Sequence, residues 1–288
     1  MKSVLYFGDP QGALALLERG IDLCGVVHGR RGGPGATALL PRLRSTPRLQ
    51  LPDLDDPTVV ERLAALKPDL IVAAFYPKRI PAPVLALAPG LNVHPSALPR
   101  FRGPDPILWT LRSGDPETEV CVQLLALGLD EGDVLRRDRF EVGPRESSGS
   151  LSMRLEAHGA VAIAEVALLF LEGRAPVPVP QEGEVVWAPQ LAPEEAEIDW
   201  QLSAVEVDRF VRACAPYPGA FTGIGEELLV VLEVRPVDAG TFGVLPPGTP
   251  YVQGGCAFIR CGEGAVRLQR LRLGRRPLTG RQLASLLV

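Results

Sequence analysis

Two polar side chains stand close together at the end of a short apolar segment. Asn92 and His94 flank Val93, which closes a predicted buried strand at Leu91–Val93, and Pro95 follows. Residues two apart on extended backbone point to the same face, so both polar side chains are predicted to face one way. Histidine changes charge near neutral pH and acts as a general acid or base. An Asn-x-His pair at a strand end therefore favours a catalytic site over a histidine packed in the core.

Such a histidine needs a carboxylate to orient its ring, and one segment supplies three. Gly128–Asp133 reads GLDEGD and contains Asp130, Glu131 and Asp133 in a turn-rich loop. A carboxylate beside an imidazole fixes its tautomer and favours its protonated form. The spacing does not choose among the three, and at least one of them is expected to be an ordinary solvated turn residue.

The other histidines and the cysteines give weaker signals. His158 lies in a helical segment and is expected to be structural or exposed. His28 ends a predicted strand before a glycine-rich loop, where a ligand contact is the alternative to a structural role. The five cysteines are odd in number and have no CxxC spacing. This argues against a zinc ribbon or a disulfide scaffold and favours reduced thiols in a cytoplasmic protein.

The elements that position these side chains alternate between strand and helix patterns. Short apolar runs predict buried strands at Val4–Phe7, Leu23–Val27, Leu70–Ala74, Leu91–Val93 and Val120–Leu125. Helical spacing predicts helices at Gln11–Arg19, Thr58–Leu66, Pro81–Leu87, Pro106–Ser113 and Ser147–Leu171. The alternation is typical of an α/β, Rossmann-like fold, an open and mostly parallel sheet with helices on both faces. Ligands bind such sheets beyond the carboxyl ends of the strands, where His94 is predicted to lie.

The composition changes in the last third of the chain. Ala175–Pro180 reads APVPVP, an extended stretch typical of a linker. A short helix is predicted at Val205–Ala213, and the apolar runs after it, separated by Gly and Pro, predict a small OB-like β-barrel. We therefore expect a catalytic domain at 1–174, a linker at 175–203 and a C-terminal β-barrel domain at 204–288.

Charge and hydropathy exclude several classes of protein. The 288 residues have a formal net charge of −4 and a pI of about 5.6, which excludes a uniformly basic nucleic-acid coat. The segment from Arg260 to the end nevertheless holds seven arginines and one glutamate, a net charge of +6. This is a candidate phosphate-contacting strip, and the alternative is a solvated strand edge. No apolar run reaches the roughly 18 residues of a membrane-spanning helix, and no signal peptide is expected.

Longer motifs resemble a known family. The run NVHPSALPRFRGPDPILWTLRSGDPETEV at 92–120, followed by GLDEGDVL at 128–135, resembles the 10-formyltetrahydrofolate-dependent formyltransferases. Three later segments are similar to the C-terminal blocks of the methionyl-tRNA formyltransferase group, so the resemblance extends over nearly the whole chain. These segments are Trp187–Trp200, Val211–Thr222 and Cys261–Leu271.

The resemblance implies a catalytic set and a reaction. Asn92, His94 and Asp130 match the family's catalytic residues, and the reaction transfers a formyl group from 10-formyltetrahydrofolate to a primary amine. Asn92 would donate to the tetrahedral oxyanion, and protonated His94 would stabilise it or relay a proton. Asp130 would hold the histidine, or a water that removes the amine proton. Folate is then a co-substrate, and neither a metal nor a covalent enzyme intermediate is needed.

The resemblance also implies two folate-binding loops and a set of substrate contacts. The pterin is expected to lie against the loops at Phe75–Ile80 and Leu127–Asp130, largely through backbone hydrogen bonds. The expected cofactor-binding residues are Phe75, Tyr76, Pro77, Lys78, Arg79, Ile80, Leu127, Gly128 and Leu129. The expected substrate-binding residues are Ser96, Arg100, Arg102, Arg30, Arg31 and Arg42.

The chain departs from the methionyl-tRNA formyltransferase pattern close to these contacts. Arg102–Ile107 reads RGPDPI where that group usually has RGAAPI. Phe75–Pro81 reads FYPKRIP where the group has an AYG-x-x-LP loop. The basic insertion at His28–Arg44 is shortened and has no lysine. These differences leave the three catalytic residues unchanged and concern the contacts to folate and to the acceptor.

Four functions therefore stand beside one another. The favoured one is formyl transfer to methionyl-tRNA, with initiator tRNA bound through the arginine-rich surface. The second is formyl transfer to a small amine, such as a nucleotide-linked amino sugar or a natural-product intermediate. The third is hydrolysis of formyltetrahydrofolate, and the fourth is folate or RNA binding without turnover, against which the intact catalytic set argues. A cytoplasmic location is expected, without membrane contact or an obligate protein partner.

Overall fold

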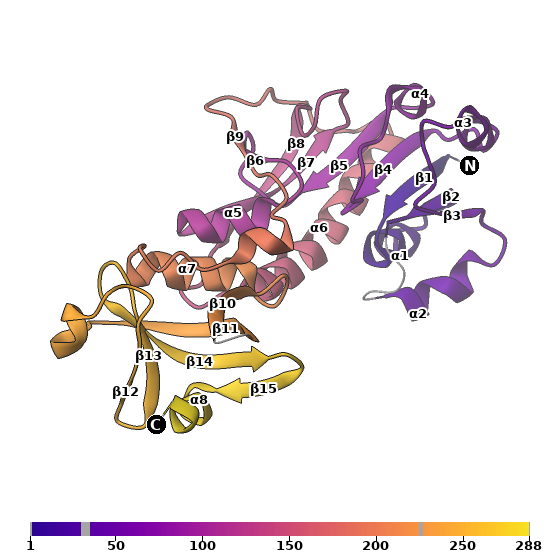
Figure 1. The fold of residues 1–288 in the computed structure, drawn as a ribbon. Coiled ribbons are helices and arrows are strands. Elements are labelled where there is room, and N and C mark those ends of the chain that lie inside the picture. Colours follow the sequence, from indigo (N-terminus) through magenta and orange to yellow (C-terminus); the bar gives the residue numbers. More distant parts are fainter. Residues whose placement is uncertain (1, 30–34, 225–226, 288) are drawn as a thin grey trace. The chain divides into compact units, whose positions relative to one another are not determined.

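The structure is a computed structural model of the 288-residue chain and describes residues 2–29, 35–224 and 227–287 (Figure 1). It divides into two compact units, each assembled from separate stretches of the chain. The first comprises Met1–Pro106, Glu117–Glu141 and Met153–Ala188, and the second comprises Ile107–Pro116, Val142–Ser152 and Pro189–Val288. The domain boundaries expected at 174/175 and 203/204 stay a prediction.

A seven-stranded sheet forms the first unit. Its order is β3-β2-β1-β4-β5-β7-β8, in which the first five strands are parallel and the last two antiparallel. The strands are β1 (Ser3–Gly8), β2 (Asp22–His28), β3 (Arg48–Gln50), β4 (Leu70–Ala74), β5 (Gly90–His94), β7 (Glu117–Leu124) and β8 (Val134–Glu141). The mostly parallel sheet expected from the sequence is confirmed. The strand order reverses between β1 and β4, and the carboxyl ends of β4 and β5 lie beside that reversal, where such sheets bind ligands.

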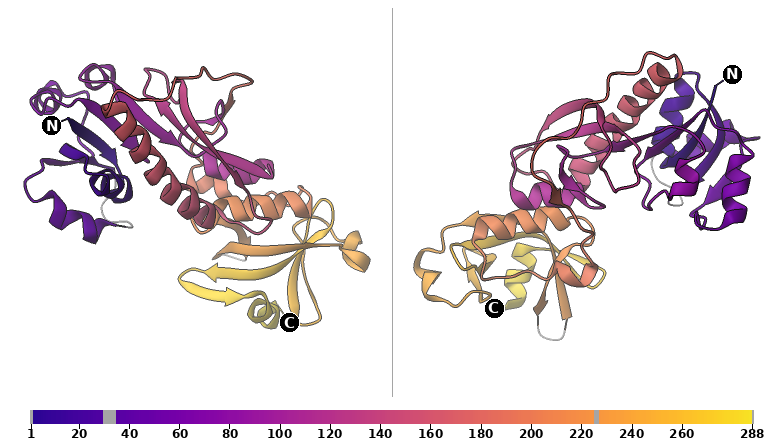
Figure 2. Two further views of the ribbon diagram at one scale, coloured as in Figure 1. Left: turned by 180° about the vertical axis from the view of Figure 1, so that it is seen from behind. Right: turned by 90° about the horizontal axis from the view of Figure 1, so that it is seen from above.

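Helices cover both faces of this sheet, and alternate residues of one strand face different helices. Phe7 packs in one core cluster with Leu63 of α3 and Val84 of α4. On the other face, Gly159 of α6 lies against Val93, and Figure 2 shows α6 crossing the strands when the molecule is seen from behind. The helices of this unit are α1 (Pro10–Glu18), α2 (Ala36–Leu39), η1 (Leu40–Leu43), α3 (Pro57–Ala64), α4 (Ala82–Leu85) and α6 (Ser148–Leu171), whose first turns belong to the second unit.

Local sequence explains where two of these helices begin. The Asp9 carboxylate accepts a hydrogen bond from the backbone N–H of Gly12 at 3.0 Å, and Asp56 accepts one from Thr58 at 2.8 Å. A proline occupies the first turn of both helices, where its missing N–H costs nothing. Aspartate followed by proline therefore fixes the point at which the chain leaves the preceding segment and enters each helix.

The apolar runs of the sequence do not predict the edge strand β8, although it is eight residues long. After two buried residues its burial alternates, and its exposed positions carry arginine and glutamate in the run VLRRDRFE. A strand at the edge of a sheet faces water on one side and carries charges that deter further pairing. The low apolar content of β8 therefore resembles that of a polar loop.

Two short strands were missed as well. β6 (Arg100–Arg102) pairs in parallel with β9 (Val186–Trp187), which lies in the segment expected to be a linker. Within that segment, Val179 also exchanges backbone hydrogen bonds with Val134 of β8 at 2.8 and 2.9 Å. The segment expected to be a linker is thus paired at two places, with β8 at Val179 and with β6 at β9.

The second unit is rich in antiparallel strands, as expected. Its strand order is β10-β11-β14-β13-β12, with β15 paired to β14. The pairings among the described residues end at β10 and β12, so closure into a barrel stays a prediction. The elements are α5 (Pro106–Ser113), which continues from the first unit, η2 (Pro193–Ala196), α7 (Ala204–Cys214), β10 (Ala220–Ile224), β11 (Glu227–Val237), η3 (Gly240–Val244), β12 (Pro250–Gln253), β13 (Cys256–Arg260), β14 (Ala265–Leu273), β15 (Arg276–Thr279) and α8 (Gly280–Leu287).

One face of this antiparallel sheet is closed by two helices. Val207 of α7 and Leu283 of α8 share a buried cluster with Val231 and Leu268 of the sheet. Ser203 and Glu206 form a reciprocal capping box at the start of α7. Among the described residues, no helix of either unit is long and apolar enough to cross a membrane.

Candidate active site

Three polar side chains meet at the carboxyl end of β5. Asn92 lies within β5 and His94 is its last residue, while Asp130 follows β7, which pairs with β5. The Asn92 amide Nδ2 donates to Asp130 Oδ1 at 3.2 Å, and His94 Nδ1 lies 3.5 Å from Asp130 Oδ2. The side chains of His94 and Asp130 are only 6% and 8% exposed. The same-face placement expected for Asn92 and His94 therefore converges on one carboxylate.

Both ring nitrogens of His94 face oxygen acceptors. Nε2 lies 2.8 Å from the backbone carbonyl of Phe101, and Nδ1 faces the Asp130 carboxylate. A neutral imidazole has one donor and one acceptor, whereas the imidazolium has two donors. The protonated ring is therefore the form that can donate to both neighbours.

The Asp130 carboxylate is held from several sides. Besides Asn92 and His94, it accepts hydrogen bonds from Gln123 Nε2 at 3.0 Å and from the backbone N–H of Gly103 at 3.1 Å. These contacts select Asp130 among the three carboxylates that the sequence left open. Glu131 is 50% exposed and lies 3.8 Å from Arg102, as expected for a turn carboxylate.

The loop that carries Phe101 and Gly103 needs a glycine at one position. Gly103 has φ of 126°, a region that L side chains rarely adopt, and a Cβ there would stand 2.6 Å from the carbonyl oxygen of Ala188. The N–H of this residue is one of the donors to Asp130. Gly103 therefore sets both the conformation of this loop and the orientation of the Asp130 carboxylate.

We expect Gly103→Ala to lower kcat of the reaction performed at this site by about 10- to 100-fold, because a displacement near 1 Å can cost up to about 10²-fold. Steady-state kinetics of the purified variant measure this effect. Gly223→Ala is the control, since a Cβ at Gly223 of β10 meets nothing within 4 Å. Equal kcat in Gly103→Ala and wild type would contradict the role assigned to this loop.

The two loops expected to bind folate lie next to each other. Arg79 donates a hydrogen bond to the carbonyl oxygen of Leu127 at 3.2 Å and so bridges them. Leu127 and Leu129 are 61% and 44% exposed, which leaves apolar side chains open to a ligand. Phe75 has φ of 56°, a strained conformation for a bulky residue and one that clusters at ligand sites.

The other residues of the first loop divide between core and surface. Ile80 is buried and belongs to the core cluster of α3 and α4, so its side chain braces the loop from inside. Pro77 and Lys78 are exposed. Tyr76 packs edge-on against Phe7, and burial raises its pKa to about 12. Its hydroxyl is buried without a hydrogen-bond partner among the described residues, an arrangement that a bound ligand could satisfy.

The expected substrate-binding residues do not form one group. Ser96 is fully buried, and its hydroxyl donates to the carbonyl oxygen of Arg100 at 2.7 Å. Arg102 is turned inward to Gln181 at 2.8 Å, whereas Arg100 is exposed. Arg42 is exposed on η1, several strands away from β5 in the sheet order. Arg30 and Arg31 lie outside the described residues.

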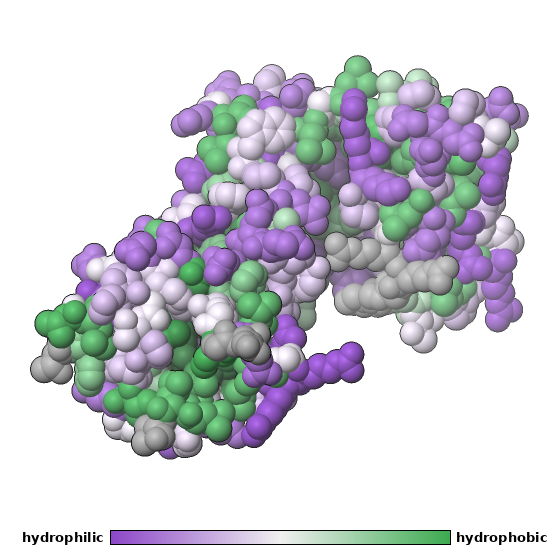
Figure 3. All heavy atoms as spheres, in the orientation of Figure 1, coloured by the Kyte–Doolittle hydropathy of each residue, from purple (hydrophilic) through white to green (hydrophobic). Residues whose placement is uncertain are grey.

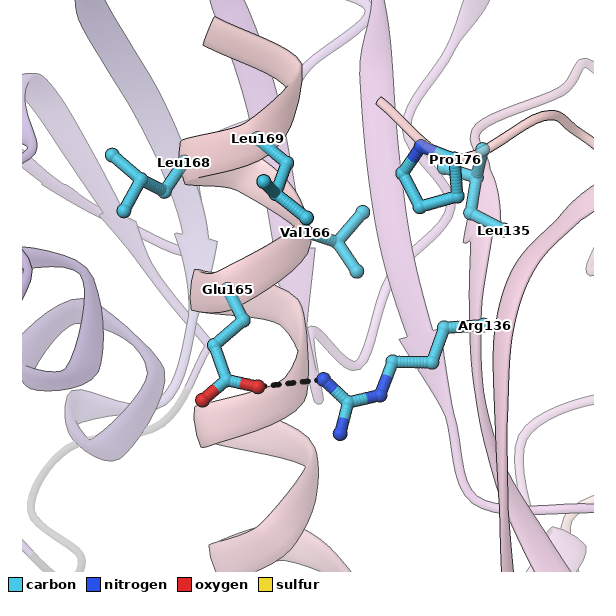
Figure 4. A pocket seen from close by; sticks show the side chains of 7 residues that line it. All are labelled: Leu135, Arg136, Glu165, Val166, Leu168, Leu169 and Pro176. Carbon is cyan, nitrogen blue, oxygen red and sulfur yellow. Dashed lines mark hydrogen bonds and ion pairs between the residues drawn. The ribbon is translucent and has the colours of Figure 1, made fainter. Parts of the chain in front are cut away.

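In the first unit, a cavity of about 280 Å³ lies beside residues 97–100, which follow His94 in the chain. Its lining includes Arg100, Glu119 and Arg137. Another cavity, of about 390 Å³, lies between α6 and β8 and encloses the Arg136–Glu165 ion pair at 2.7 Å (Figure 4). This larger cavity is mostly apolar and contains no predicted site residue. Its lining is Leu135, Arg136, Glu165, Val166, Leu168, Leu169 and Pro176.

Comparison with known proteins agrees with this geometry. The model of a family described as formyl transferase matches residues 35–167, and that of the formyl transferase C-terminal domain matches residues 190–286. A methionyl-tRNA formyltransferase of Myxococcus xanthus is 35% identical over 284 residues, covering 93% of this chain and 89% of that protein. A methionyl-tRNA formyltransferase of Anaeromyxobacter dehalogenans strain 2CP-1 is 37% identical over 95% of this chain and 93% of its own length. The chain belongs to the formyl transferase family.

Solved structures share the fold of this formyltransferase. A methionyl-tRNA formyltransferase from Clostridium thermocellum has a TM-score of 0.57 at 15% identity, covering 95% of this chain and 99% of that one. An N-formyltransferase from Helicobacter canadensis, in complex with folinic acid and dTDP-3-aminofucose, has a TM-score of 0.69 at 12% identity over 93% and 99% of the two chains. HypX from Aquifex aeolicus, in complex with tetrahydrofolic acid, has a TM-score of 0.67 at 21% identity over 98% of this chain. The chain spans about half of HypX, 46% of its length.

Two residues of this candidate site are not among the predicted ones. Gln123 is 1% exposed in β7, and the only signal for it was an amide within the apolar run of a predicted strand. Gln181 reaches Gln123, Asp130 and Gly132 from the segment expected to be a linker. No pattern around Gln181 in the sequence points to a site.

Proposed function

We propose that this formyltransferase moves the formyl group of 10-formyltetrahydrofolate to the amino group of methionyl-tRNA. The observation that carries the proposal is the meeting of Asn92, His94 and Asp130 at the carboxyl end of β5. It supplies an amide donor, a ring with both nitrogens facing acceptors and a buried carboxylate. These groups suit acyl transfer through a tetrahedral intermediate.

In the proposed reaction, the amine nitrogen attacks the formyl carbon and a C–N bond forms. The carbonyl oxygen then carries negative charge, which an N–H of Asn92 and the imidazolium of His94 stabilise in a site shielded from water. Asp130 keeps the ring of His94 oriented. The bond between the formyl carbon and N10 of the folate then breaks, and the proton that the amine loses passes to N10 as it leaves, relayed by His94.

The residues present fit a folate. The two bridged loops offer the exposed apolar side chains of Leu127 and Leu129 to the flat faces of a pterin. The buried hydroxyl of Tyr76, without a partner among the described residues, offers a polar contact. When bound, 10-formyltetrahydrofolate supplies an activated formyl group, while the protein supplies orientation and charge stabilisation.

Charge on the second unit favours a polyanionic acceptor. Arg235 of β11 and Arg267 of β14 stand directly opposite each other, and Arg235 is paired with Glu233 at 3.2 Å. Nη1 of Arg235 is buried and has no hydrogen-bond partner within the part of the chain that the structure describes. Figure 3 shows further hydrophilic side chains projecting at the tip of the β14–β15 hairpin, which carries Arg275 and Arg276. We call Arg235, Arg267, Arg270 and Arg272 the arginine face.

Removing charge from the arginine face is expected to weaken tRNA binding. For Arg235→Gln with Arg267→Gln, the slope of log affinity against log salt for methionyl-tRNA should fall by about 0.9 for each phosphate that the variant no longer neutralises. Filter binding at several salt concentrations measures the slope. Arg174→Gln, an exposed arginine of the first unit paired with Glu172, is the control. A slope unchanged from wild type would exclude this face as a tRNA contact.

A small amine is the second candidate acceptor, because the loops beside the site depart from the methionyl-tRNA formyltransferase pattern. Arg102–Ile107 and Phe75–Pro81 both differ from it. A competition experiment decides between the two acceptors. The enzyme receives labelled 10-formyltetrahydrofolate with equal concentrations of methionyl-tRNA and of a dTDP-linked amino sugar. We expect the label on methionine, and label on the sugar alone would overturn the assignment.

A further inference from the structure

Gln181 lies in the segment that the sequence presents as a linker, yet its side chain is saturated with contacts in the first unit. Its carbonyl oxygen accepts from Arg102 Nε at 3.1 Å and from Arg102 Nη2 at 2.8 Å. Its amide Nε2 donates to the backbone carbonyls of Asp130 at 2.9 Å and Gly132 at 2.8 Å. The arginine fixes the orientation of the amide, because a guanidinium only donates and the oxygen must therefore face it.

A second amide continues the chain of hydrogen bonds. Gln181 Nε2 lies 3.2 Å from Gln123 Oε1, and Gln123 Nε2 donates to the Asp130 carboxylate at 3.0 Å. Donors and acceptors therefore alternate in one direction, from Arg102 through Gln181 and Gln123 to Asp130. Hydrogen bonds in such a chain polarise one another. Both the backbone and the carboxylate of Asp130 are thus reached from Gln181.

Asp130 needs this support because its backbone is strained. Its φ is 54°, in the left-handed region that residues other than glycine seldom occupy. Such a conformation persists only where the surroundings over-determine it. The hydrogen bond from Gln181 to the Asp130 carbonyl holds the strained residue itself. The hydrogen bond to the Gly132 carbonyl holds the loop two residues later.

Gly132 shows how tightly this loop is packed. A Cβ at that position would stand 1.8 Å from the backbone oxygen of Leu124, so the loop lies directly against β7. Gln181 holds the same residue through its hydrogen bond to the Gly132 carbonyl. The backbone beside Asp130 is thus fixed by packing on β7 and by the Gln181 amide.

We propose that Gln181 is a positioning residue, which fixes the backbone and the carboxylate of Asp130 so that it faces His94 and Asn92. The inference deepens the proposed function and rests on it. Gln181 touches neither reacting atom, and it acts through Gln123 and Asp130. Two further ties hold it in place, the Val179–Val134 pairing on one side and the β6–β9 pairing on the other.

The test is Gln181→Glu, which keeps the size of the side chain and an oxygen for Arg102 but removes the N–H donors. We expect kcat for methionyl-tRNA formylation to fall by about 10- to 100-fold, with the melting temperature close to that of wild type. KM for 10-formyltetrahydrofolate and for methionyl-tRNA should stay near the wild-type values, because Gln181 contacts Asp130 and not the substrates. A purely structural role would lower the melting temperature, and kcat per folded active site would stay at the wild-type value.

Three comparisons complete the experiment. Gln201→Glu makes the same chemical change at an exposed position of the second unit and should keep wild-type kcat. Gln123→Ala combined with Gln181→Glu should cost little more than the worse single variant, because both act through one chain of bonds. Wild-type kcat in Gln181→Glu would overturn the inference. Absence of formyl transfer in the wild-type enzyme would instead overturn the proposed function.

Discussion

Replacing His94 by alanine is expected to lower kcat of formyl transfer by about 10²- to 10⁴-fold, the range for loss of a positioned general acid or base. The variant removes the ring that faces both Asp130 and the Phe101 carbonyl. Asp130 would then remain as a buried carboxylate without the ring that faces it. Steady-state kinetics with saturating 10-formyltetrahydrofolate and methionyl-tRNA measure the loss.

A matched histidine variant separates catalysis from folding. His158 lies on α6 and bonds to Asp138 at 2.7 Å, so it is also a partly buried histidine beside a carboxylate. We expect His158→Ala to keep kcat near that of wild type. Full activity in His94→Ala, or an equal loss in the two variants, would contradict the catalytic role of His94.

Asn92→Ala is expected to lower kcat by about 10²- to 10³-fold, the usual cost of one oxyanion donor. Its effect should fall on kcat with little change in KM for either substrate, because the oxyanion exists only in the transition state. The amide also donates to Asp130 at 3.2 Å, and Gln123 and Gly103 still hold that carboxylate in the variant. The geometry around His94 should therefore persist.

The separate effects on kcat and KM distinguish an oxyanion donor from a residue that only binds substrate. A rise in KM at constant kcat would mean that Asn92 contributes to substrate binding alone. Binding of tetrahydrofolate, followed by fluorescence, provides a direct control for the integrity of the folate loops. A near-normal kcat in Asn92→Ala would contradict the assignment of the oxyanion donor.

The sequence predicts the fold best where burial is complete. β4 consists of five buried residues, and the structure gives Leu70–Ala74, the range expected from the apolar run. α5 likewise has the expected bounds, Pro106–Ser113. β8 was missed because four consecutive charged residues, RRDR, fill its centre at the edge of the sheet. Apolar runs mark strands that are buried on both faces, whereas an edge strand is only partly buried.

The candidate site was likewise predictable only in part. Asn92 and His94 were predictable because a period of two on one strand places them on the same face. The choice of Asp130 over Glu131 came from the family resemblance and not from spacing, since it depends on a left-handed backbone angle that turns one carboxylate inward. Gln181 was not predictable from the sequence. Its contacts depend on where the segment after the proline-rich stretch runs in the folded structure, and its neighbours in sequence do not indicate that.

The most direct test of the proposed function is a single turnover with enzyme in excess. Formyl-labelled 10-formyltetrahydrofolate is mixed with methionyl-tRNA, the ester bond is hydrolysed, and the released amino acid is identified by mass spectrometry. We predict labelled N-formylmethionine from the wild-type enzyme and at least about 10²-fold slower formation from His94→Ala. Label recovered as free formate, or N-formylmethionine formed at the same rate by both enzymes, would contradict the account.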